Sequence, residues 1–542
     1  MTVMLRTTFL LLSLWISSIL GLCPQNCSCD NEYQLSVSCS NVKLQYLPFL
    51  LHPGTQSLRL FRCQIKQLDP DILELYPDII HLDLSSNNIS LLGNNIFQYQ
   101  SKTQSLNLSG NNFLAIFRNS FYGLHKLQHL DLSSGRLQII ESNAFEHLRE
   151  LLEFNLSHNE LQNLSFSTFN GLTNLQKLFV AGNQITYLDG LIAESLPNLR
   201  TIDLSHNMIT VIASDALLGL NVIRTIDLSA NFLQQIPIFG QNNLINLEYL
   251  NIGFNKLTRI EPYSFRSLLA LLELDLTNND FVILPPLAFD GLFRLQRLIL
   301  NGQRYLREIQ SGAFSGLASL EVLDLSYSRL LEHIDKDAFE VSHALHTFNV
   351  SFCALKTFPR SLFDWKRVAE LYLYGNPLHC DHKLLTFLPD VLRLRSIHNV
   401  ICATPDKLHN ISISSLDTVE VAVEDAKRTV TILCSILTAL TVIIVLLFFL
   451  YSRIAPINEQ VKKSKFLEQC YRTLPGRREC ILPEYYNSVI EFNTSTSGRE
   501  ITFEELYESK SSYDRISPHQ PPPFSAIHTD DLPPYRICNE IN

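Results

Sequence analysis

The chain has 542 residues, of which 46% are hydrophobic and 18% are charged. These proportions argue against an intrinsically disordered protein. A net charge of −10 argues against nucleic acid as a partner, because nucleic-acid-binding proteins normally present a basic face. Twelve cysteines in so long a chain exclude a small disulfide-stabilised scaffold.

The first apolar segment lies at the N-terminus. Residues 9–20 are mostly apolar, Arg6 precedes them, and a cysteine-rich stretch follows. A short apolar run behind a positive charge is typical of a secretory signal peptide, which we expect to span residues 1–21.

A polar column repeats through most of the chain. From position 87 to position 303 it recurs every 24 residues, and asparagine is its usual residue. It begins at 63 and continues at 328, 353 and 376, so that about fourteen units occupy residues 51–376. The asparagine is replaced at five positions, which are Cys63, Gly135, Gln303, Ser328 and Cys353. A second column is aromatic and comprises Phe97, Phe121, Phe145, Phe169, Phe265, Phe289, Phe314, Phe339 and Phe363.

Alternating leucines before each asparagine predict a short strand with its apolar side chains inward. The asparagine amide, turned inward, can bond backbone groups that no strand pairing satisfies, and the phenylalanines fill the opposite side. One unit cannot bury its own apolar face, so the units must stack. The repeat resembles the leucine-rich repeat. The resemblance implies an α/β solenoid shaped like a horseshoe, with a parallel sheet whose concave face is the usual docking surface.

Cysteines precede the repeats in residues 22–50. Four cysteines, at Cys23, Cys27, Cys29 and Cys39, allow three disulfide connectivities. The stretch closely resembles the N-terminal cysteine cap of extracellular leucine-rich-repeat proteins. That resemblance implies the pairs Cys23–Cys29 and Cys27–Cys39.

Residues 377–420 resemble the C-terminal cap of the same proteins, with one departure. His382 stands where that cap has its second cysteine, and no cysteine follows Cys402 before the second apolar segment. One disulfide is therefore missing from the family pattern, and the resemblance implies a single pair, Cys380–Cys402.

Two other groups of residues raise the question of chemistry. His379, Asp381 and His382 are crowded into one short segment, which suits cap residues better than a tetrahedral zinc site. Cys63 and Cys353 lie too far apart along the stack to pair and are expected to be free thiols. The sequence has no nucleophile elbow, zinc-protease motif, P-loop or dinucleotide fingerprint. We therefore expect no enzymatic activity, catalytic residue, metal or cofactor.

Residues 429–451 form the second apolar segment and contain no charge. At ~1.5 Å per residue, a helix of this length crosses about 30 Å of hydrocarbon, which favours a transmembrane helix over a buried core helix. Basic residues follow it, whereas Lys427 and Arg428, at the end of a juxtamembrane linker 421–428, are offset by nearby acidic residues. With a cleaved signal, this asymmetry predicts a type I single-pass protein of the plasma membrane with its N-terminus outside.

Residues 452–542 are expected to form a disordered cytoplasmic tail. Two proline-rich stretches, at 521–523 and 532–535, fit ligands of SH3 or WW adaptor domains. Two further stretches fit the tyrosine-x-x-hydrophobic form of sorting signals, with the defining residues Tyr471, Leu474, Tyr486 and Val489. The alternative is a solvated linker without adaptors.

Glycosylation is expected at six sequons, which are Asn88, Asn107, Asn155, Asn163, Asn349 and Asn410. The sequon at Asn26 has cysteine as its middle residue inside the disulfide knot, and Asn493 lies in the predicted tail, so we expect neither to carry a glycan. Three of the six asparagines occupy outward strand positions, where glycans would crowd the concave face. A window between about residues 177 and 327 stays free of sugar.

The same window contains departures from the repeat. Phe179 and Ile299 replace a polar outward residue, and Tyr249 and Arg297 occupy neighbouring outward positions. Exposed aromatic, arginine and apolar residues often anchor interfaces, so these four are the predicted ligand contacts. The alternative is neutral drift on a tolerant scaffold.

Residues 23 to about 420 resemble extracellular leucine-rich-repeat transmembrane proteins. These include neuronal adhesion and synapse-organising receptors and the ectodomains of Toll-like receptors. The resemblance implies a cell-surface receptor or adhesion protein that binds a protein ligand through its concave face and couples to cytoplasmic adaptors. The tail is too short for the signalling domain of Toll-like receptors. The alternatives are a Toll-like innate-immune receptor or co-receptor without its own signalling domain, or an organiser of apical extracellular matrix.

Overall fold

The structure is a computed structural model, and it describes residues 23–30, 35–164, 166–188, 192–239, 244–339, 344–416 and 427–452. The predicted signal peptide and the four tail residues Tyr471, Leu474, Tyr486 and Val489 lie outside these ranges. The chain divides into two compact units, residues 1–435 and residues 436–542.

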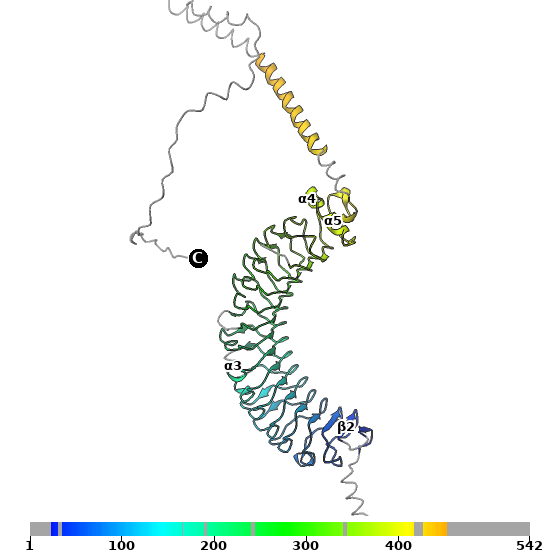
Figure 1. Ribbon diagram of the computed structural model, residues 1–542, viewed down its shortest axis with the longest axis vertical. Coiled ribbons are helices and arrows are strands. Elements are labelled where there is room, and N and C mark those ends of the chain that lie inside the picture. Colours follow the sequence, from blue (N-terminus) through cyan, green and yellow to red (C-terminus); the bar gives the residue numbers. More distant parts are fainter. Residues whose placement is uncertain are drawn as a thin grey trace, which may run out of the picture. The chain divides into compact units, whose positions relative to one another are not determined.

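A sixteen-stranded sheet runs through the first unit. Its first strand pairs antiparallel with the second, and every later pair is parallel. Fourteen successive strands, from β3 to β23, define about thirteen turns of a solenoid that follows an arc (Figure 1). In sheet order the strands are β1 (Cys27–Cys29), β2 (Ser36–Ser40), β3 (Ser57–Phe61), β4 (His81–Asp83), β5 (Ser105–Asn107), β7 (His129–Asp131), β9 (Glu153–Asn155), β10 (Lys177–Phe179), β12 (Thr201–Asp203), β14 (Thr225–Asp227), β15 (Tyr249–Asn251), β16 (Glu273–Asp275), β18 (Arg297–Ile299), β20 (Val322–Asp324), β22 (Thr347–Asn349) and β23 (Glu370–Tyr372).

Shorter elements connect the strands of the main sheet. Seven two-residue strands form three small parallel sheets, and they are β6 (Ala115–Ile116), β8 (Ile139–Ile140), β11 (Tyr187–Leu188), β13 (Val211–Ile212), β17 (Ile283–Leu284), β19 (Glu308–Ile309) and β21 (His333–Ile334). The helical elements of the solenoid and its C-terminal cap are α2 (Pro70–Leu73), η1 (Phe166–Phe169), α3 (Ile192–Ser195), α4 (His382–Leu385), α5 (Leu388–Arg393), η2 (Asp406–Leu408) and η3 (Ile413–Ser415). Figure 1 shows α3 on the outer side of the arc.

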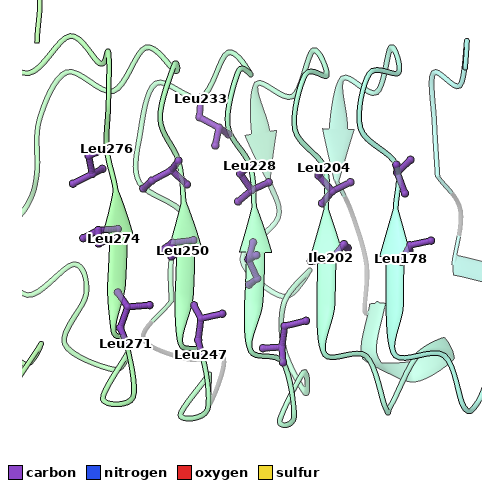
Figure 2. Close-up of a cluster of buried hydrophobic side chains, with 14 of the residues drawn as sticks. Leu178, Ile202, Leu204, Leu228, Leu233, Leu247, Leu250, Leu271, Leu274 and Leu276 are labelled. Carbon is purple, nitrogen blue, oxygen red and sulfur yellow. The ribbon is translucent and has the colours of Figure 1, made fainter. Parts of the chain in front are cut away.

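The core is a set of leucine columns behind the sheet. Figure 2 shows Leu178, Ile202, Leu250 and Leu274 at the middle of β10, β12, β15 and β16, and each is at most 2% exposed. Burying one such side chain stabilises the fold by roughly 1.5–3 kcal/mol. Because the columns are continuous from turn to turn, each turn depends on its two neighbours for burial.

An asparagine ladder links the turns, as the sequence predicts. The buried Asn87 amide donates to the carbonyls of Leu60 and Leu84 at 2.7 and 2.8 Å. Its Oδ1 accepts the backbone N–H groups of Cys63 and Ile65 at 2.9 and 3.1 Å. Equivalent bonds recur along the column at Asn111, Asn159, Asn183, Asn207, Asn231, Asn255, Asn279 and Asn376.

A stack of phenylalanine rings provides a second link. Phe97 and Phe121 have ring centroids 6.3 Å apart, and Phe265 and Phe289 lie 6.2 Å apart. Phe239, which lies outside the sequence column, also joins the stack, at 6.3 Å from Phe265. Its place was missed because it sits out of the 24-residue register.

Disulfides close both ends of the solenoid. The structure pairs Cys23 with Cys29 and Cys27 with Cys39, as the N-terminal resemblance implied. Cys380 pairs with Cys402 in the C-terminal cap. The free thiols of the solenoid are Cys63 and Cys353, and both are buried.

The residues weighed as a zinc site serve the C-terminal cap. Asp381 caps α4, where its Oδ1 accepts the Leu384 N–H at 2.8 Å. His379 Nδ1 lies 2.7 Å from Thr404 Oγ1. In the described ranges, no group of three His, Cys, Asp or Glu residues is arranged to hold a metal ion.

The described part of the chain contains one helix that is long and apolar enough to cross a membrane, Lys427–Ser452. It has 26 residues and extends beyond both limits of the predicted segment 429–451. It begins and ends at polar residues, which flank the uncharged stretch.

Candidate functional site: the outward face of the sheet

Each three-residue strand presents its first and third residues outward and buries the second. In β15, for example, Tyr249 and Asn251 are partly exposed and Leu250 is buried. Parallel pairing then places outward residues of neighbouring turns side by side, although about 24 positions separate them in sequence. The outward face therefore consists of two parallel columns of side chains.

The third residue of each strand, which points outward, has a structural role in most turns. Asp203 Oδ1 accepts the backbone N–H of Ser205 at 2.9 Å, and Asp227 does the same for Ser229. Such a bond holds the chain as it leaves the strand. An acidic residue in this column is therefore no evidence of a ligand. Phe179 and Ile299 have no side-chain oxygen to accept this N–H, so the structural role does not explain why they stand at this position.

Three of the four predicted contact residues lie close together. Tyr249 on β15 neighbours Glu273 on β16, and Glu273 neighbours Arg297 on β18. Arg297 Nε lies 3.2 Å from Glu273 Oε2, and Ile299 ends the same strand as Arg297. We call Tyr249, Glu273, Arg297 and Ile299 the central cluster.

Phe179 does not join the central cluster. It lies on β10, between Asn155 of β9 and Asp203 of β12, and its strand is three places from β15 in the sheet. Sequence reasoning missed Glu273, because an acidic residue at a first outward position looks ordinary. Only the register places it between Tyr249 and Arg297.

Burial and carboxylates shape the electrostatics of this region. Burial, followed by the charges of Asp227, Asp275 and Glu273, raises the pKa of Tyr249 to about 12. Burial also raises the pKa of Asp227 above its usual range, against the hydrogen bonds from Ser229. The Tyr249 phenol is therefore neutral at physiological pH and presents a hydroxyl among carboxylates.

The expected glycosylation sites fall into two groups. The first group stands at the third residue of a strand and is partly buried, and it comprises Asn107, Asn155 and Asn349. Each of these side chains accepts, through Oδ1, the backbone N–H two residues later. That bond leaves Nδ2, the atom that carries a glycan, outside the turn. The other sequon asparagines, Asn88, Asn163 and Asn410, are exposed and lie outside the strands.

The central cluster, on β15, β16 and β18, thus lies within a stretch of seven strands, β10 to β20, whose outward positions contain no sequon. Asn155 borders this stretch on β9 and Asn349 borders it on β22. What the arrangement offers chemically is a mixed surface of an aromatic hydroxyl, an ion pair and an aliphatic side chain. It has the residue types of a protein interface rather than the grouped nucleophiles and bases of a catalytic centre.

Comparison with protein families places repeats along the solenoid. The leucine-rich repeat family matches residues 101–161, 125–185, 173–233, 245–304 and 293–355. Comparison with curated proteins yields no match.

Solved structures with the same fold are numerous, and their sequence identities are low. The Toll–Spatzle complex of Drosophila matches with 20% identity and a TM-score of 0.55, over 70% of this chain and 56% of that chain. The LRIM1/APL1C complex matches with 19% identity and a TM-score of 0.53, over 78% and 74%. A leucine-rich-repeat protein of Leptospira interrogans matches with 24% identity and a TM-score of 0.52, over 63% and 83%. This chain thus spans just over half of the Toll chain. The solenoid is therefore a leucine-rich-repeat solenoid, with family repeats over residues 101–233 and 245–355.

Proposed function

We propose that this chain is a cell-surface receptor or adhesion protein that binds a protein ligand on the outward face of β10 to β20. The observation that carries the proposal is the central cluster, which combines an aromatic, an arginine and an aliphatic residue between two expected glycans. Buried aromatic and arginine anchors dominate binding energy in protein interfaces. Two of the solved structures that match this fold are complexes, of Toll with Spatzle and of LRIM1 with APL1C, which supports a protein as the ligand class.

The direct test compares single substitutions on the two parts of the face. Arg297→Ala and Tyr249→Ala should each weaken ligand binding by about tenfold or more, as expected for interface anchors. The matched control is His129→Ala, at the first outward position of β7, which lies between Asn107 and Asn155. Binding by cells that display the full chain would be measured after proximity labelling has identified a partner. Equal loss with His129→Ala, or no loss with either cluster variant, would contradict the proposal.

Membrane anchorage is the second part of the proposal. The helix Lys427–Ser452 would span the plasma membrane once, with the solenoid outside and residues 453–542 in the cytoplasm. External protease on intact cells should digest the solenoid and spare an epitope at the C-terminus. The opposite pattern would overturn this orientation.

The tail would connect the receptor to cytoplasmic adaptors. Replacing Tyr471 and Tyr486 together by alanine should slow internalisation and raise the surface level, because both sorting signals are then lost. Unchanged uptake in the double variant would rule out these signals and leave the ligand site untouched.

A further inference from the structure

Aromatic residues stand at the third residue of two strands of the main sheet. In the described strands from β4 to β23, this residue is otherwise an aspartate, an asparagine or Ile299, and the aromatic exceptions are Phe179 on β10 and Tyr372 on β23. The register places Phe179 directly beside Asn155 on the preceding strand. It places Tyr372 directly beside Asn349 in the same way. Both aromatic residues therefore follow a sequon asparagine by one turn.

The two sequon asparagines hold their side chains alike. In Asn155 and Asn349, Oδ1 accepts the backbone N–H two residues later, at 3.0 and 3.1 Å. By contrast, Asn251 belongs to no sequon, and its Nδ2 donates to Asp227 Oδ2 at 3.2 Å. Neighbouring strands lie about 4.8 Å apart, so a sugar attached to Nδ2 starts within reach of the ring beside it.

The two rings are accessible and have no part in holding the turn. An aromatic residue has no oxygen at the place where Asp203 Oδ1 accepts the Ser205 N–H. Tyr372 is 39% exposed and Phe179 is partly exposed in the described part of the chain. An aromatic ring offers a flat apolar face with negative charge density above it. N-acetylglucosamine has one face made of C–H groups, so it can pack on such a ring and exclude water between them.

We propose that Phe179 and Tyr372 are platforms on which the first sugars of the glycans at Asn155 and Asn349 stack. The inference rests on the proposed extracellular position of the solenoid, and it requires no particular protein ligand.

The platforms decide where each glycan leans. The Asn155 glycan is held over β10, and the Asn349 glycan is held over β23 and away from β20. The face left open to a ligand then runs from β12 to β20, with the central cluster in its middle. Phe179 departs from the repeat because it supports a glycan, and this explains why it stands apart from the central cluster.

Asn107 provides a comparison within the same chain. It is also the third residue of a strand, and its Oδ1 makes the same bond, at 2.9 Å. The residue beside it on the following turn is Asp131, whose carboxylate presents no apolar face. A glycan on Asn107 therefore has no platform and should move freely.

Site-by-site release of glycans tests the platforms. The full chain, made in cells that leave high-mannose glycans and held in lipid nanodiscs, is treated with an endoglycosidase that cuts between the first two N-acetylglucosamine residues. Peptide mass spectrometry then gives a release rate for each asparagine. Release at Asn155 and Asn349 should be about threefold or more slower than at Asn107, since stacking on the ring must be broken first.

Single substitutions assign the effect to each ring. Phe179→Asp should bring release at Asn155 to the fast rate and leave Asn349 unchanged. The variant keeps the fold, because aspartate already stands at this position in the next turn, at Asp203. Tyr372→Asp should speed release at Asn349 alone. Phe179→Tyr, which keeps a ring, should keep the slow rate.

A platform can also be built where none exists. Asp131→Phe places a ring beside Asn107 and should slow release there. Equal release rates at Asn107, Asn155 and Asn349, or rates that ignore the two aspartate variants, would overturn the platforms and leave the extracellular position intact. An empty site at Asn155 or Asn349 beside an occupied Asn107 would also overturn them. Absence of glycan from all three sites would overturn the extracellular position as well.

Discussion

The turns around Asn207 and those around Ser328 are joined to their neighbours in opposite ways. Around Asn207 the asparagine ladder is complete: its amide donates to the Val180 and Leu204 carbonyls at 3.0 Å, and its Oδ1 accepts the Ile185 N–H at 3.1 Å. The phenylalanine stack is interrupted there, because no two described aromatic rings between residues 155 and 238 are in contact.

Around Ser328 the ladder is lost and the stack is complete. Gln303 Nε2 donates to the Leu276 carbonyl, but its buried Oε1 has no partner among the described residues. Ser328 Oγ accepts only a long bond of 3.4 Å from the Gln303 N–H, and the Cys353 thiol lies 3.3 Å from the Leu325 carbonyl. The rings of Phe289, Phe314, Phe339 and Phe363 contact one another in a row.

This comparison suggests that each stretch of the solenoid keeps at least one of two links between turns. One link is polar and satisfies backbone groups that would otherwise be buried without partners. The other is apolar and acts through ring contacts and buried area. A turn that retains either link remains attached to its neighbours, so the loss of a link should cost most where the other is absent.

The largest effect is expected from Phe314→Ala. Phe314 is 3% exposed and contacts rings on both sides, at 5.9 and 4.8 Å, in a stretch without the ladder. Removing it should lower the local opening free energy by about 3–5 kcal/mol, as for other buried phenylalanines. Native-state hydrogen exchange of residues 298–350 measures this loss. A loss below ~1 kcal/mol would show that the stack contributes little.

A somewhat smaller effect is expected from Asn207→Ala. The substitution leaves the buried Ile185 N–H without its partner, whereas the Val180 and Leu204 carbonyls keep their bonds from Asn183 and Asn231. The expected cost is about 2 kcal/mol, seen as faster exchange at Ile185 and its neighbours. Ser328→Ala, in the same column, is the control and should cost less than about 1 kcal/mol. Equal costs at both positions would break the comparison.

Gln303→Asn should repair part of the ladder. Asn279 Oδ1 accepts the Leu257 N–H at 3.1 Å, and an asparagine at 303 would offer the same bond to Phe281 one turn later. We expect a gain of about 1 kcal/mol, the net value of a buried hydrogen bond. The opening free energy at Phe281 measures it. Destabilisation would show that the longer unit after Gln303 requires the longer side chain.

The smallest effect is expected from Asp227→Asn, which tests the outward column beside the intact ladder. Burial raises the pKa of Asp227, so its carboxylate binds a proton more tightly in the folded chain than in the unfolded chain. The aspartate therefore costs stability at neutral pH, and this cost disappears as the pH falls below the ordinary pKa of about 4. Asparagine fills the same position in β5 and β9. The variant should gain up to about 0.5 kcal/mol at pH 7 and nothing at pH 3, measured by exchange at Ser229.

Much of the fold follows from the sequence because the repeat is local. A single unit contains its strand, its ladder residue and its aromatic residue, and their spacing predicts which side chains turn inward. Fourteen similar units then have one economical way to bury their leucines, which is to stack. The cysteine pattern of the N-terminal cap was informative for the same reason.

The candidate site was harder to predict. Tyr249, Arg297 and Ile299 could be selected as unusual residues, but Phe179 was selected by the same rule and lies three strands away from Tyr249. Glu273 was overlooked, although its carboxylate pairs with Arg297. Departure from a consensus shows that a residue is unusual, and it does not show which other residues stand beside it.

The sequence by itself determined the period, the inward and outward faces, the ladder and the apolar segment near the C-terminus, because each depends on residues close together in the chain. The tertiary structure decided what lies across the turns. It placed Arg297 against Glu273, brought Phe239 into the stack out of register, and made β23 the last strand of the main sheet among the described residues. These contacts join residues about 24 or more positions apart, or depend on where the stack stops. They therefore follow from how the turns are packed and closed, which no single repeat encodes.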